Sequence, residues 1–169
     1  MVYLSTSQYI FEVQYGLGED FPLIFASLAV GVGFATYLNG VFVVRVGMKR
    51  IALVSLISYT LSALIYVLMF FNKENPPLWI LLIFFAIQFT SVGFLFGNLR
   101  ALAMQPIGHI AGVGAAINGF VSTVMGVIIA SVIGAYISTT VWPLFLGFTV
   151  CGFASMVIFL QNKPLERTI

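Results

Sequence analysis

Charged residues are scarce in this sequence. Only 7% of its 169 residues are Asp, Glu, Lys or Arg, whereas 61% are hydrophobic and the mean hydropathy is +1.11. A soluble domain usually carries about 25% charged residues, so the composition excludes an ordinary soluble globule. The few basic residues are separated by long apolar stretches and do not gather on one face, and we therefore expect no nucleic-acid partner.

Side chains that bind metals or act as nucleophiles are scarce as well. The sequence has a single cysteine, Cys151 in an apolar run, and a single histidine, His109. A disulfide within the chain is therefore excluded. No group of ligands has the spacing of a metal site, and no nucleophile is paired with a base. We expect neither a metal nor a cofactor, and we do not expect an enzyme.

Long apolar segments predict an all-α integral membrane protein embedded in a lipid bilayer. The hydrocarbon core of a bilayer is about 30 Å thick, and about 20 helical residues cross it. The first 16 residues are too few for a full crossing and predict only a partial span. The remaining predicted spans are residues 21–44, 51–71, 78–97, 108–137 and 141–160, followed by a polar tail at 161–169. The prediction is a single six-helix transmembrane domain whose first helix is truncated.

Small residues recur at every fourth position in the fifth predicted span. They are Gly108, Gly112 and Ala116, and then Ser122, Gly126, Ala130, Gly134 and Ser138. This spacing places small side chains on one helix face, where another backbone can approach closely. We therefore expect Gly112, Gly126 and Gly134 to pack against neighbouring helices.

The basic residues mark one side of the predicted spans. If the turn at Arg45 faces the cytoplasm, only Lys73 lies on the opposite side. The basic residues on the cytoplasmic side would be Arg45, Lys49, Arg50, Arg100, Lys163 and Arg167. Cytoplasmic loops of membrane proteins carry an excess of Lys and Arg. The sequence therefore predicts two cytoplasmic termini, and we expect a bacterial inner membrane.

The loop between the second and third spans resembles a known transporter signature. Residues 40–50, GVFVVRVGMKR, are similar to the G-x-x-x-D-R-x-G-R-R/K run that joins two helices in each half of major facilitator superfamily transporters. The residues that match are Gly40, Arg45, Gly47 and Lys49, and Arg50 follows them in the same cytoplasmic loop. Val44 replaces the acidic residue of the signature and Met48 its first basic residue, as is usual in the second half of such transporters.

Two further runs resemble the Bcr/CflA group of drug-resistance transporters within that superfamily. They are residues 106–112, PIGHIAG, and residues 11–17, FEVQYGL. The resemblance implies the C-terminal half of a twelve-helix, proton-coupled exporter of small, drug-like amphipathic compounds. Its partner would be an N-terminal six-helix half, encoded upstream in the same gene or as a separate chain. In this family the proton-coupling acids lie mostly in that first half.

Uncharged polar residues within the spans are the candidate cavity residues. The resemblance places the helices that carry them partly around a central cavity, and a hydrogen bond between helices is the alternative for each. These candidates are Gln8, Tyr9, Tyr37, Gln88, Asn118 and Ser122. Glu12 is the one acid in a span-like segment, which makes it a candidate for proton coupling. An interfacial, water-exposed Glu12 is the competing interpretation.

Other functions remain open at this point. Two copies of the chain could assemble and replace the two halves of a transporter. The chain could also be a membrane scaffold that transports nothing, or a fragment without activity. Because alternating access rocks two bundles about a central site, the presence of a second bundle discriminates among these alternatives.

Overall fold

The computed structural model describes residues 1–71 and 74–161, and these residues contain helices and no strand. The chain begins with α1 (Val2–Gln8), the π-helical segment η1 (Tyr9–Gln14) and the 3-10 turn η2 (Gly18–Asp20). The long helices are α2 (Phe21–Val46), α3 (Met48–Met69), α4 (Leu78–Met104), α5 (Ala111–Ala135) and α6 (Trp142–Gln161). A 3-10 segment, η3 (Gln105–Ile110), joins α4 to α5.

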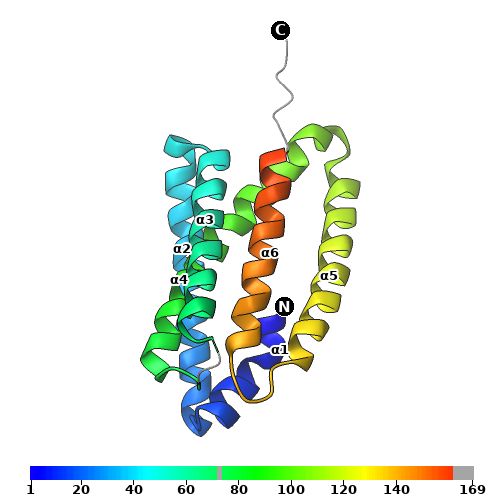
Figure 1. Ribbon diagram of the computed structural model, residues 1–169. Coiled ribbons are helices and arrows are strands. Elements are labelled where there is room, and N and C mark those ends of the chain that lie inside the picture. Colours follow the sequence, from blue (N-terminus) through cyan, green and yellow to red (C-terminus); the bar gives the residue numbers. More distant parts are fainter. Residues whose placement is uncertain (72–73, 162–169) are drawn as a thin grey trace.

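The long helices run up and down in sequence order (Figure 1). The α2–α3 turn, the α4–α5 connection and the end of α6 lie at the upper end of the molecule in this view. The connections from η1 to α2, from α3 to α4 and from α5 to α6 lie at the lower end. Each connection is short, so neighbouring helices in the sequence are antiparallel.

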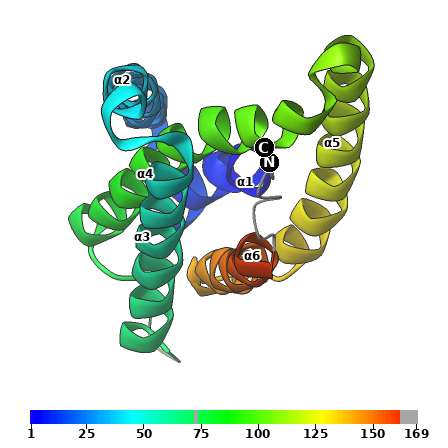
Figure 2. The same cartoon turned by 90° about the horizontal axis from the view of Figure 1, so that it is seen from above.

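Helix α3 is central to the packing, because it contacts both α4 and α6. Helix α2 packs on the other side of α4, and the short α1 packs on α5 (Figure 2). An aromatic cluster fills the interior between α3, α4 and α6. The ring of Tyr66 stacks on that of Phe145 with centroids 3.8 Å apart, and Phe85 stacks on Phe145 at 5.4 Å. Such pairs are worth about 0.5–1.5 kcal/mol beyond the area that they bury.

Four helical stretches of the described residues are long and apolar enough to cross a membrane. They are Gly18–Val46, Met48–Met69, Leu78–Ala135 and Trp142–Gln161. The third has 58 residues, far more than the roughly 20 that one crossing needs, and it consists of α4, η3 and α5. The protein is therefore an all-α protein of membrane type. The expectation of a partial transmembrane span in residues 1–16 is not met, since α1 and η1 belong to none of these stretches.

Helix boundaries differ from the expected spans around Pro106. Helix α4 continues past Gly97 to Met104, and α5 begins at Ala111 instead of Gly108. Pro106 has no backbone N–H to donate, and Ile107 leaves helical geometry with φ −116° and ψ 25°. The connection is therefore a tighter 3-10 turn rather than the first turn of a long helix.

The small-residue face of α5 meets another helix only in its C-terminal part. A Cβ atom built on Gly126 would lie 3.3 Å from Met1 Cγ, and one on Gly134 would lie 3.7 Å from Thr6 Cγ2. A Cβ on Gly112 would meet no described atom within 4 Å. Gly126 and Gly134 therefore lie beside Met1 and α1, whereas Gly112 has no neighbour among the described residues. The reason is that α1 is too short to cover the N-terminal half of α5.

Candidate transport face and polar interior

Charged residues of opposite sign belong to segments at opposite ends of the described molecule, and Figure 1 shows where these turns and connections lie. Its basic residues, Arg45, Lys49, Arg50 and Arg100, lie in the upper turns and the last turns of α4. Its carboxylates, Glu12, Glu19, Asp20 and Glu74, lie in the lower connections and in η1. We call these the basic end and the acidic end. Lys73, Lys163 and Arg167 fall outside the described residues.

The turn that carries the transporter-like signature is tight and exposed. Gly47 has φ 87°, a conformation that L side chains rarely adopt, and its N–H donates to Val43 O at 3.0 Å. Arg45 closes α2, and Lys49 lies in the first turn of α3. Val44, at the position of the missing acid, is 86% exposed. The turn thus keeps the glycine geometry but has no carboxylate at this position to pair with Arg45.

Gln88 lies in the interface between α3 and α4, where its side chain is only 1% exposed. Its Nε2 donates to Tyr59 O at 3.1 Å and to Ser62 Oγ at 3.2 Å. Its Oε1 is buried without a hydrogen-bond partner among the described residues. Gln88 therefore bonds α4 to α3 and does not line an open cavity. The sequence left two interpretations of Gln88 open, and the geometry supports the hydrogen bond between helices.

A second polar contact joins α2 to α4. Asn98 Nδ2 donates to Asn39 Oδ1 at 2.6 Å and to Phe94 O at 2.8 Å, and both asparagines are buried. In hydrocarbon an unsatisfied amide is costly, which favours helices that satisfy such groups against each other. This pair fixes the rotation of α2 against α4. Neither asparagine is among the predicted cavity candidates. Asn39 lies within the expected second span, and Asn98 lies just beyond the expected end of the fourth span at Gly97.

Exposed polar groups lie between α4 and α5. A Cβ on Gly119 of α5 would be 4.0 Å from Nη2 of Arg100, whose side chain is exposed. Ser122 Oγ donates to Asn118 Oδ1 at 3.4 Å on the same helix. Arg100 and Asn118 thus bring polar atoms to neighbouring positions of two long apolar helices. We call this set the α4–α5 face, and it is defined by Arg100, Asn118, Gly119 and Ser122.

The N-terminal candidates are engaged locally at the acidic end. Gln8 Nε2 donates to Glu12 Oε2 at 3.1 Å, one helical turn away. The hydroxyl of Tyr9 donates to Ser138 O at 2.6 Å and so ties η1 to the α5–α6 connection. Glu12 itself is half-buried and lies in η1, at the acidic end.

The predicted cavity residues do not converge on one site. Asn118 and Ser122 lie on the α4–α5 face, Gln88 is in the core, and Tyr37 of α2 is 70% exposed. Arg100 completes the face, but the sequence assigned it only to the basic side of the membrane. A signal for it was present, because Arg100 precedes the end of α4 by one turn and so projects from a helix, not from a loop.

Comparison of the chain with protein families, with curated proteins and with solved structures found no match.

Proposed function

We propose that the chain is one bundle of a membrane transporter, the C-terminal half of a twelve-helix, proton-coupled exporter of small amphipathic compounds. The proposal rests on the α4–α5 face and on the transporter-like runs at residues 40–50, 106–112 and 11–17. A charged or amide side chain facing lipid is costly. Arg100 and Asn118 therefore need water or protein opposite them. A second bundle that encloses an aqueous cavity provides both.

The charge distribution supports the orientation of this bundle. All described basic residues lie at one end, and all described carboxylates lie at the other. The positive-inside rule then assigns the basic end to the cytoplasm. In this orientation the α4–α5 face opens toward the cytoplasmic half of the bilayer, where an exporter collects its substrate.

The residues divide into two roles in this proposal. Arg100, Asn118 and Ser122 contact the substrate from α4 and α5, since their polar atoms are exposed on the face. Gln88 and the buried asparagine pair keep the bundle rigid while it rocks against its partner. Alternating access requires such rigid halves on either side of a mid-membrane site. Glu12 remains the candidate for proton coupling on this chain.

Co-production tests the proposal. Cells that make this chain together with the N-terminal half of a Bcr/CflA-type exporter should expel ethidium in a proton-dependent way, and cells that make either half alone should not. For a neutral substrate with carbonyl or nitro oxygens, such as chloramphenicol, Arg100→Gln should lower the efflux rate of the pair by about tenfold, because one hydrogen bond from the guanidinium to a bound ligand is worth on the order of 1–2 kcal/mol. Arg50→Gln, at the exposed α2–α3 turn, is the matched control and should leave the rate nearly unchanged.

An assembly of two copies is the second candidate function. The N-terminal half of α5 carries the uncovered Gly112 and an exposed Ala116, and small residues of this kind let a helix of another copy approach closely. Proton-dependent efflux by the lone chain, together with a dimeric mass in detergent, would establish this candidate in place of the first. Equal efflux rates for Arg100→Gln and Arg50→Gln would remove the α4–α5 face from either mechanism.

A further inference from the structure

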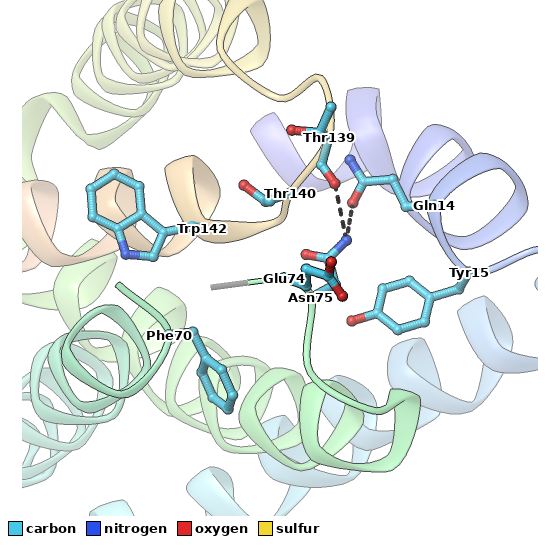
Figure 3. A pocket seen from close by; sticks show the side chains of 8 residues that line it. All are labelled: Gln14, Tyr15, Phe70, Glu74, Asn75, Thr139, Thr140 and Trp142. Atoms are coloured by element: carbon cyan, nitrogen blue, oxygen red, sulfur yellow. Dashed lines mark hydrogen bonds between the residues drawn. The ribbon is translucent and has the colours of Figure 1, made fainter. Parts of the chain in front are cut away.

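A cavity of about 710 Å³ lies at the acidic end, between η1, the α3–α4 connection and the start of α6 (Figure 3). Its walls combine three aromatic rings with one carboxylate and several uncharged polar groups. The lining residues are Gln14, Tyr15, Phe70, Glu74, Asn75, Thr139, Thr140 and Trp142. The cavity is separate from the α4–α5 face, which lies near the basic end.

Asn75 holds the three walls together. Its Nδ2 donates to Gln14 Oε1 at 2.9 Å and to Thr139 O at 3.3 Å, and its Oδ1 accepts from the Val141 N–H at 2.8 Å. Figure 3 shows Asn75 at the centre of the site, with both dashed bonds reaching toward the opposite wall. Because one side chain bonds to segments far apart in the sequence, the cavity is a built feature of the fold.

The polar atoms of the aromatic residues are already engaged. The hydroxyl of Tyr15 donates to Pro76 O at 2.8 Å, and the indole Nε1 of Trp142 donates to Val67 O at 3.1 Å. These bonds fix the two rings, and the rings of Tyr15, Phe70 and Trp142 are then offered to a ligand as apolar and π surface. Ring faces of this kind attract cations that lie within about 6 Å of their centroids.

The groups that remain for a ligand are a carboxylate and a donor. Glu74 contributes a negative charge to the cavity lining, and its side chain is exposed. Gln14 Nε2 is buried without a hydrogen-bond partner among the described residues. Other carboxylates, Glu12, Glu19 and Asp20, lie at the same end of the molecule and outnumber Lys73, which precedes Glu74 in the sequence, so the surrounding potential favours cations.

We propose that this cavity binds an organic monocation with an aromatic or aliphatic body. The Glu74 carboxylate pairs with the cationic centre, and the rings of Tyr15, Phe70 and Trp142 contact the body. Gln14 Nε2 donates to an oxygen of the ligand where it has one. The site lies within one bundle, and its binding activity needs neither a second bundle nor transport.

Two ions of the same shape and opposite charge test the proposal. Tetraphenylphosphonium and tetraphenylborate both offer aromatic bodies, and only the first is a cation. The full chain carries two tryptophans, Trp79 and Trp142, so Trp79→Phe leaves Trp142 as the only indole reporter. When this variant in nanodiscs of uncharged lipid is titrated with tetraphenylphosphonium, the fluorescence of Trp142 should be quenched to a saturating level. Tetraphenylborate should bind about tenfold more weakly, because attraction by Glu74 becomes repulsion.

A charge-removing variant locates the cation. In the same background Glu74→Gln should weaken tetraphenylphosphonium binding by about threefold to fivefold, as expected for one partly solvated ion pair. Glu19→Gln removes a carboxylate of the same end that does not line the cavity, and it should change the affinity by less than about twofold. Equilibrium dialysis with labelled phosphonium gives the affinity without the fluorescence reporter.

Two results would overturn the site. One is equal affinity for the two ions in equilibrium dialysis, which would show that the cavity does not select for positive charge. The other is an unchanged affinity for tetraphenylphosphonium in the Glu74→Gln variant, provided that this variant elutes from size exclusion at the same volume as the parent protein. Loss of ethidium efflux in the two-half transporter has no bearing on either result, so failure of this site and failure of the proposed function are distinguishable.

Discussion

Gly93 is the position where a single added methyl group should do the most damage to the bundle. A Cβ atom built there would lie 2.7 Å from Ala35 Cβ and 2.9 Å from Val32 O. Carbon atoms in proteins approach to about 3.5–4.0 Å, so Gly93→Ala forces α4 away from α2 by about 1 Å. Val32 O belongs to the backbone of α2 and cannot rotate away, and the whole helix must move.

The expected cost follows from two opposing terms. Overpacking of a close interface costs about 1–3 kcal/mol. The higher helix propensity of alanine offsets about 1 kcal/mol of this. Separation of the helices also lengthens the Asn98–Asn39 hydrogen bond, which is 2.6 Å long across the same interface. The net expectation for Gly93→Ala is a loss of about 1–2 kcal/mol in the free energy of unfolding.

Gly33→Ala is the matched control. Gly33 is also a helical glycine, on α2, but a Cβ there would meet no described atom within 4 Å. Its substitution should be neutral or should stabilise by up to about 1 kcal/mol. Unfolding in SDS, followed by far-UV circular dichroism and by the size-exclusion profile, measures both variants. If Gly93→Ala unfolds at the same SDS fraction as Gly33→Ala, the close approach of α2 and α4 is refuted.

Three further predictions address topology, the polar interior and α5. On intact cells a membrane-impermeant maleimide should label Glu19→Cys and should label Lys49→Cys only after permeabilisation, because the positive-inside rule assigns the basic end to the cytoplasm. Gln88→Leu should change the free energy of unfolding by less than about 1 kcal/mol, since interhelical hydrogen bonds in membranes average about 0.6 kcal/mol and the substitution also removes a buried unpaired oxygen. Gly134→Leu should lower the folded yield, because the new side chain meets Thr6 of α1.

Controls make each of these results decisive. The labelling experiment uses a Cys151→Ala background, and labelling of the Lys49→Cys variant on intact cells would reverse the orientation. Gln88→Glu places a charge in the core and should prevent folding, so a yield equal to that of Gln88→Leu would show that position 88 is hydrated. Val132→Leu adds bulk to an exposed position of α5, and a folded yield as low as that of Gly134→Leu would contradict the α1–α5 contact.

The positions of the long helices followed from the sequence, because each needs only an apolar run and a break. Pro76 and Pro77 end the connection before α4, and Gly47 ends α2, as hydropathy and turn chemistry predict. The break at Gly97 was a wrong prediction. A glycine within an apolar run does not end a helix in lipid, where backbone groups are satisfied only within the helix. The end of α4 instead depends on Pro106.

Tertiary structure decided which polar residues meet. Sequence alone showed that Gln88 and Asn118 are polar interruptions of apolar helices, and it left Asn98 and Arg100 beyond the expected end of the fourth span. Hydropathy carries no information on the rotation of one helix against another. That rotation is set by the contact at Gly93, which brings Asn39 to Asn98, and by the aromatic packing of α3 against α6. It buries Gln88 between two helices and leaves Arg100 exposed beside α5. The cavity at the acidic end likewise required three connections that are distant in sequence, because only their approach in space lets Asn75 bond to both neighbours.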